Sequence, residues 1–136
     1  MRLHLVLALA AIDAYAQAAS EWPQFRGPNA SGVAVDANLP AAFGPQKNVV
    51  WKTSLPPGNS SPAVAGDRIY LTAVEHEKLF TIALDRASGK VLWRREAPRP
   101  RKQVIERPAN GPVSATPVTD GRNAYAFFQD FGLLAY

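Results

Sequence analysis

Short runs of β-branched, aromatic and small apolar residues alternate with polar turns along most of the chain after Asn48. Apolar runs of about four to eight residues between Gly, Pro, Asp and Asn are typical of β-strands and not of helices. The pattern predicts strands at residues 49–53, 61–65, 68–74, 79–84 and 91–95. Turns are predicted between these strands, and we therefore expect an all-β fold.

The strand pattern then repeats. Val50-Trp51-Lys52 matches Leu92-Trp93-Arg94, 42 positions further on. The segment 61–70 matches 116–125, with Pro, Gly and Tyr at the same internal positions, and Ala135-Tyr136 stands where Ala83-Leu84 stands in the first copy. A period in the low forties with four short strands per unit is typical of a β-propeller blade.

The turn at residues 85–90 links two predicted strands. Asp85 can accept hydrogen bonds from backbone N–H groups of its own turn, and Gly89 can adopt a positive φ. Trp93, on the strand after the turn, can lie over the turn of a neighbouring unit, where its indole N–H reaches a backbone carbonyl. We expect this turn to carry the adhesion between units.

This unit resembles the tryptophan-docking repeat of the pyrroloquinoline-quinone-like (PQQ-like) β-propellers, a family of quinoprotein dehydrogenases and of scaffolds such as the outer-membrane assembly lipoprotein B proteins. The segments 61–64, 67–70 and 22–28 resemble the family too. The resemblance implies a propeller of which the chain holds the first blade and part of the second. Its blade-docking residues are Ala83, Asp85, Ser88, Gly89, Trp93 and the matching Trp51.

The domain organisation follows from these segments. Residues 1–18 have the positive start, apolar run and Ala-x-Ala sites of a signal peptide, which predicts a periplasmic or secreted protein with no transmembrane segment after cleavage. Residues 19–47 are expected to form an irregular arm, and residues 48–97 a closing outer strand plus the first blade. Residues 98–136 are expected to hold a basic inter-blade loop and an incomplete second blade. A closed propeller has about four to eight blades, so further blades or an oligomer are needed for closure.

Charge and composition narrow the function classes. The net charge of +4 is mild and gives no support to a nucleic-acid partner. The absence of cysteine excludes disulfides, a cysteine zinc site and a lipidated cysteine within this chain. Much of the excess positive charge comes from one segment, from Arg94 to Arg107, which includes the predicted inter-blade loop. Its basic residues either bind an acidic partner or are simply solvated; they are Arg99, Arg101, Lys102 and Arg107.

Two other groups of residues have alternative interpretations. His76 between Glu75 and Glu77 suggests either a metal or acid–base site or a solvated loop tip. The aromatic arm suggests either a ligand site or aromatics that dock on the main body; its residues are Trp22, Phe25 and Arg26. The sequence predicts no catalytic residue and no metal ligand.

Two functions fit the resemblance. The first is a non-catalytic exported scaffold whose rim loops bind another exported protein or a cell-envelope polymer. The second is a quinoprotein dehydrogenase that oxidises an alcohol or sugar with pyrroloquinoline quinone and Ca²⁺. The family's alcohol-oxidising enzymes hold a vicinal cysteine pair against the quinone and place their carboxylates in later blades, and the chain contains neither. The first function is favoured.

Overall fold

The structure is a computed structural model of the 136-residue chain. It describes residues 21–34, 40–101 and 111–136, so the predicted signal peptide, residues 1–18, lies outside the described residues. Within the described ranges, no helix is long and apolar enough to cross a membrane.

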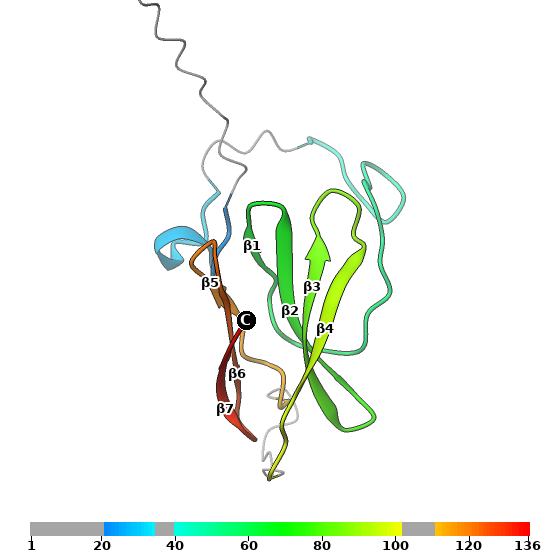
Figure 1. Cartoon of the computed structure of the whole chain (residues 1–136). Coiled ribbons are helices and arrows are strands. Elements are labelled where there is room, and N and C mark those ends of the chain that lie inside the picture. The colour runs from blue at the N-terminus through cyan, green and yellow to red at the C-terminus, as the bar shows by residue number, and fades with distance from the viewer. Residues whose placement is uncertain (1–20, 35–39, 102–110) are drawn as a thin grey trace, which may run out of the picture.

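The first sheet has four antiparallel strands in sequence order (Figure 1). They are β1 (Ala63–Ala65), β2 (Arg68–Glu75), β3 (Lys78–Asp85) and β4 (Val91–Ala97). Each corresponds to a predicted strand. The first is shorter than expected because Pro62 has no N–H and the N–H of Ser61 donates to Thr116 Oγ1 (3.1 Å) instead of entering the ladder.

The second sheet has three antiparallel strands. They are β5 (Val118–Thr119), β6 (Ala124–Phe128) and β7 (Gly132–Ala135). The one helical element among the described residues is a short 3-10 turn, η1 (Pro28–Ala30). The expectation of a mostly-β fold is confirmed.

The two sheets have the same pairing register at the positions that the sequence repeat relates. Tyr70 of β2 lies between Ala63 and Ala83 in the first sheet. In the second sheet Tyr125 of β6 lies between Val118 and Ala135. Equivalent positions of the first two strands of each sheet are 55 residues apart in the sequence. Ala63 of β1 corresponds to Val118 of β5, and Tyr70 of β2 corresponds to Tyr125 of β6. The β6–β7 hairpin is three residues shorter than the β2–β3 hairpin. Tyr70 and its partner Ala83 are 13 positions apart, whereas Tyr125 and its partner Ala135 are 10 positions apart.

The sheets stand side by side, with β1 next to β5 (Figure 1). One face of the first sheet packs on the second sheet through two apolar clusters. The first contains Leu79, Ala97, Val113, Ala126 and Phe128, and the second contains Ala63, Tyr70, Ala83 and Ala124. Because each cluster contains residues of both sheets, burial of these apolar side chains holds the two sheets together.

The opposite face of the first sheet is covered by one extended segment. Trp51 and Leu55 pack there against the cluster of Ala73, Phe80, Ile82 and Leu84. In Figure 1 this segment passes along the side of the first sheet that faces away from the second. The prediction of a strand at residues 49–53 is wrong, because no backbone hydrogen bond joins this run to another strand within the described residues.

The arm at residues 21–34 reaches both sheets. Trp22 exchanges backbone hydrogen bonds with Val64 of β1 (2.9 and 2.8 Å), and Pro23 accepts one from Thr119 of β5 (2.9 Å). The Trp22 ring covers Gly27, where a Cβ would overlap it. Docking of the arm on the main body is therefore confirmed for its backbone at Trp22, whereas the Trp22 ring covers a residue of the arm itself and the Phe25 ring is 59% exposed.

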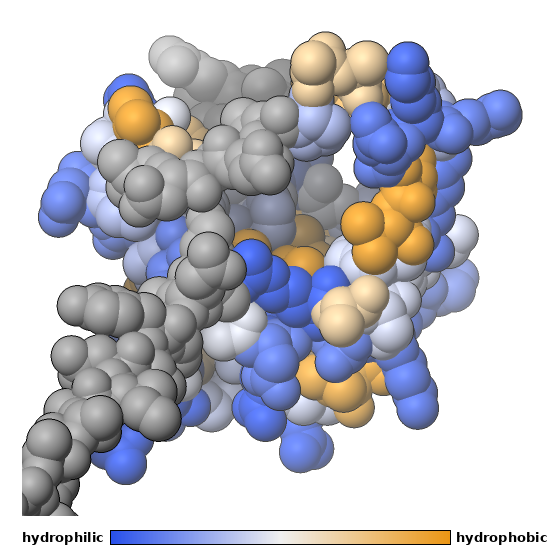
Figure 2. All heavy atoms as spheres, turned by 90° about the horizontal axis from the view of Figure 1, so that it is seen from above, coloured by the Kyte–Doolittle hydropathy of each residue, from blue (hydrophilic) through white to orange (hydrophobic). Residues whose placement is uncertain are grey.

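Apolar surface also reaches solvent. Seen from above, hydrophobic side chains are exposed in separate groups among hydrophilic ones (Figure 2). The most exposed large hydrophobic residues of the described ranges are Val50 (87%), Phe43 (81%) and Leu133 (65%).

Candidate functional site

The turn at residues 85–90 has the predicted geometry. Asp85 Oδ1 accepts hydrogen bonds from the N–H (2.7 Å) and the hydroxyl of Ser88. These two bonds, with the Ser88 hydroxyl first, hold the pKa of the Asp85 carboxyl below its usual range. Gly89 has φ 72° and donates its N–H to Asp85 O (2.8 Å). A positive φ here favours glycine because other residues are strained in that region.

Trp51 lies over this turn. Its Nε1–H donates to Arg86 O (2.9 Å), and the hydroxyl of Thr53 donates to Gly89 O (2.6 Å). A Cβ at Gly89 would overlap the Trp51 indole. Gly89 is therefore needed twice, for its backbone conformation and for the close approach of the ring. The segment before the first sheet makes the tryptophan-on-turn contact expected between units.

Trp93 occupies the matching place beside the second sheet. It pairs with Ala83 in the ladder, and its ring lies 6.1 Å from that of Tyr70 and 5.3 Å from that of Tyr136. Tyr136 exchanges backbone hydrogen bonds with Ala124 just as Leu84 pairs with Ile69. Trp93 thus meets the end of β7, as Trp51 meets the end of β3.

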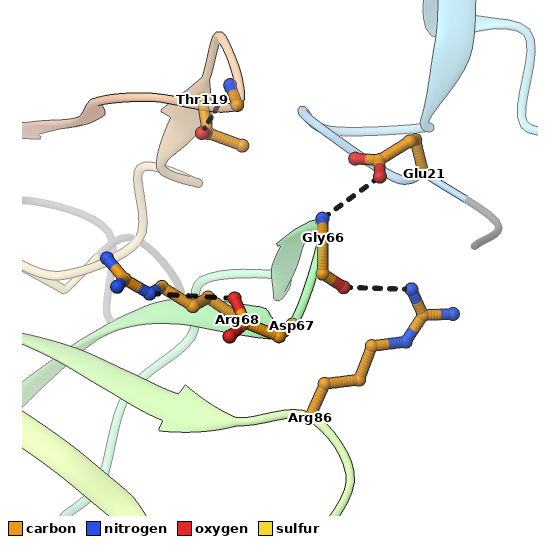
Figure 3. A network of polar contacts seen from close by, with 7 residues as sticks. Glu21, Gly66, Asp67, Arg68, Arg86 and Thr119 are labelled. Atoms are coloured by element: carbon orange, nitrogen blue, oxygen red, sulfur yellow. Dashed lines mark hydrogen bonds and ion pairs between the residues drawn. The ribbon is translucent and has the colours of Figure 1, made fainter. Parts of the chain in front are cut away.

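A polar network ties the arm to these turns (Figure 3). The N–H of Gly66 donates to Glu21 Oε1 (2.9 Å), and Arg86 Nη1 donates to Gly66 O (3.3 Å). The N–H of Arg86 also donates to Asp67 O (2.8 Å). Gly66 of the β1–β2 turn is therefore held from both sides, through its N–H by the arm and through its C=O by the β3–β4 turn.

Arg99, predicted as part of a partner-binding loop, makes a structural ion pair. Its Nε lies 2.6 Å from Asp130 Oδ2, with side-chain exposures of 18% for Arg99 and 1% for Asp130. It also donates to Glu77 O. A paired buried carboxylate is costly to leave without its cation, so the Arg99 charge serves the contact between the two sheets. No local pattern in the sequence indicates the burial of Asp130.

The rest of the predicted basic loop is only partly described. Arg101 is exposed and donates from Nη2 to Gln129 O (3.3 Å). Lys102 and Arg107 lie outside the described residues. Of the four predicted residues, the structure therefore brings Arg99 and Arg101 to the β6–β7 turn and leaves Arg101 accessible to a partner.

His76 sits at the tip of the β2–β3 hairpin, where His76 and Glu77 have positive φ (47° and 66°). Glu75 forms an ion pair with Arg94 (2.6 Å), and this hydrogen bond lowers the pKa of the Glu75 carboxyl. In the part of the chain that is described, no three His, Asp or Glu side chains gather in a way that could hold a metal ion.

A shallow pocket of about 560 Å³ lies where the arm meets the loops that lead into β1 and β5. Phe25 and Val118 supply apolar walls, and amide and hydroxyl groups supply the polar ones. Its lining residues are Gln24, Phe25, Ala30, Asn59, Ser61, Ser114, Thr116 and Val118. Concave sites with a few polar groups are where small ligands and short polymer segments bind.

Comparisons with known proteins give no match: no family model, no curated protein and no solved structure matches the chain.

Proposed function

We propose that the chain is part of an exported β-propeller of PQQ-like repeats that acts as a non-catalytic scaffold and binds another exported protein or a cell-envelope polymer through its rim loops. The observation that carries this proposal is the register shared by the two sheets, in which Tyr70 and Tyr125 occupy the same place. Repeated sheets with one register and a tryptophan contact between units are what a ring of blades requires.

The exposed face of the second sheet supports stacking beyond two units. Val118, Tyr125 and Ala135 hold the positions of Ala63, Tyr70 and Ala83. The three residues of the first sheet are buried against the second, whereas Val118 is 42% exposed. A further sheet of the same kind would cover this face as the second sheet covers the first.

The rim loops support a binding role. Asn59 and Ser61 precede β1, and Ser114 and Thr116 precede β5, so equivalent loops of the two units meet at the pocket. Propeller loops on one rim form a common surface, and loops carry much of protein recognition. Neutral amide and hydroxyl groups beside the exposed Phe25 ring suit a hydroxyl-rich or peptide-like ligand.

Titration calorimetry of the protein with pyrroloquinoline quinone and Ca²⁺ tests whether the protein binds the cofactors of a quinoprotein dehydrogenase. The described residues offer no group of carboxylates to hold the calcium ion, so no step of a quinone mechanism is assigned to them. The expected result is no stoichiometric binding. Tight one-to-one binding of the quinone would overturn the scaffold proposal in favour of a dehydrogenase.

A pull-down from envelope extracts tests the basic loop. We expect the triple variant Arg101→Ser, Lys102→Ser, Arg107→Ser to lose most of the captured partner, because charged rim residues steer acidic partners. Arg99 is left intact because its ion pair is structural. The matched control removes three exposed lysines elsewhere, Lys47, Lys52 and Lys90. Equal capture by both triple variants would contradict a role for the loop.

A further inference from the structure

The pocket between the arm and the loops before β1 and β5 has walls that are fixed by the arm backbone. Trp22 exchanges hydrogen bonds with Val64 of β1, and Pro23 O accepts the N–H of Thr119 of β5. The arm therefore lies along the first strand of each sheet (Figure 1). At these positions a peptide finds no free backbone edge to join as a further strand. A ligand of the pocket has to be recognised by side chains.

The polar side chains of the pocket offer both donors and acceptors of hydrogen bonds. Ser114 Oγ donates to Gly111 O (2.9 Å), so its lone pairs are left to accept. Thr116 Oγ1 accepts the N–H of Ser61 (3.1 Å), and no described residue accepts the Thr116 hydroxyl hydrogen. Gln24 Nε2 donates to a backbone carbonyl of the arm (3.2 Å), which fixes the amide with Oε1 as an acceptor. Sugar hydroxyl groups both donate and accept, so they can use all of these groups.

The Phe25 ring adds an exposed aromatic wall. It lines the pocket and is 59% exposed, although phenylalanine side chains are usually buried. The backbone after it forms a tight turn, in which Gln24 O accepts the N–H of Gly27 (2.9 Å) and both Arg26 and Gly27 have positive φ (63° and 67°). The face of an aromatic ring carries partial negative charge and attracts polarised C–H groups. One face of a sugar ring consists of such C–H groups.

The pocket is neutral. Among the described residues that line it, none is charged. Arg26 follows Phe25 in the chain, but its side chain packs on the arm itself, where a Cβ at Gly32 would lie 3.3 Å from Arg26 Nε. Glu21 is bound to the N–H of Gly66 and does not line the pocket. Because a charged ligand would lose hydration here without gaining an opposite charge, a neutral ligand is favoured.

We propose that this pocket binds a neutral polysaccharide chain, with one sugar ring stacked on Phe25 and its hydroxyl groups bonded to the amide and hydroxyl side chains around it. The inference rests on the proposed function, binding through rim loops, and it names the class of polymer that is bound. The shallow shape suits a chain that passes through the site. Because the arm is tied to both sheets, little has to be ordered when the ligand binds.

Titration calorimetry of the full chain with cellohexaose and with maltohexaose tests this inference. The two neutral hexamers share their hydroxyl chemistry and differ in linkage, and at least one is expected to bind. Phe25→Ala is expected to weaken binding about tenfold, and Ser114→Ala about fivefold. Phe43→Ala is the matched control, because Phe43 is 81% exposed and does not line the pocket, and it is expected to bind like the parent. Far-ultraviolet circular dichroism checks that each variant is folded.

Three outcomes overturn the glycan inference. They are no binding of either hexamer, equal binding by the parent, Phe25→Ala and Ser114→Ala, and binding of a neutral Gly-Ser decapeptide in place of both hexamers. None of them touches the scaffold proposal, which stands if the basic-loop pull-down still captures a partner. Conversely, tight binding of pyrroloquinoline quinone by a chain whose hexamer binding depends on Phe25 would overturn the scaffold proposal and support the glycan pocket.

Discussion

The two sheets have the same pairing register, yet they differ in how many of their faces are covered. In the first sheet, six consecutive residues of β3 are buried, from Leu79 to Leu84. In the second sheet, β6 alternates: Ala124, Ala126 and Phe128 are buried, and Phe127 is 48% exposed. The pairing register is the same in both sheets. Whether a residue is buried therefore depends on what packs against that face of its sheet, and not on its position along the strand.

The contact between the sheets is mixed in character. Apolar clusters form most of it, but the Thr72 hydroxyl also donates to Val113 O (3.0 Å). At its edge stands the ion pair of Arg99 with the buried Asp130. The second sheet therefore depends on the first for its one apolar core, whereas the first also has the Trp51 and Leu55 cluster on its other face.

Adjacent phenylalanines of β6 give the largest expected effect. Phe128 is fully buried between the sheets, so Phe128→Ala should lower the free energy of unfolding by about 3–5 kcal/mol. Phe127→Ala removes the same side chain from the exposed face and should change it by at most about 1 kcal/mol. Urea titration followed by tryptophan fluorescence measures both. Similar losses for the two variants would mean that the outer face is covered in solution.

Substitutions of Gly89 and Gly66 by alanine are expected to have a smaller effect on stability. Comparing them separates the cost of a positive φ from the cost of losing the Trp51 contact. Both have positive φ, but a Cβ at Gly89 would overlap Trp51, whereas nothing lies within 4 Å of one at Gly66. Gly66→Ala should cost about 1 kcal/mol from the backbone alone. Gly89→Ala should cost more and also shift the fluorescence of the undocked Trp51. If thermal unfolding shows equal losses, the tryptophan contact over the turn contributes nothing to stability.

Much of the local structure could be predicted because it depends on nearby residues. The hairpins, the Asp85 turn and the positive φ of Gly89 follow from turn chemistry and strand alternation. The recurrence of Pro, Gly and Tyr, with Ala135-Tyr136 in the place of Ala83-Leu84, aligns the two segments in the register that the two sheets have. Residues 49–53 were predicted to form a strand because their composition is that of one, but a strand also needs a partner edge, which composition cannot supply.

The candidate site was less predictable because it depends on distant contacts. Arg99 and Arg101 look alike in the sequence, yet only Arg99 meets a buried carboxylate, 31 positions away. Trp22 and Phe25 look equally able to dock, and only Trp22 finds a glycine to cover. Each difference arises from where the second sheet and the arm come to lie, and a single sequence carries no local sign of that.

The two turn aspartates give the smallest expected effect. Asp120 Oδ1 accepts hydrogen bonds from the N–H groups of Arg122 (2.8 Å) and Asn123 (2.7 Å), and its Oδ2 accepts one from the Tyr125 hydroxyl (3.0 Å). These bonds, the Asn123 N–H first, hold the pKa of the Asp120 carboxyl well below its usual range, further than Ser88 holds that of Asp85.

A folded-state pKa below the unfolded value means that each carboxylate stabilises the protein above about pH 4, and that this contribution is lost as the pH falls through the folded pKa. Asp120→Asn should therefore lower stability at pH 7 and flatten its decline between pH 5 and pH 2, as measured by urea midpoints, and Asp85→Asn should do so less. The second sheet would then depend more on its turn carboxylate than the first, as expected for a sheet with fewer strands and one covered face. Parallel declines for the parent and Asp120→Asn would contradict this, since the carboxylate would then titrate alike in the folded and unfolded chains.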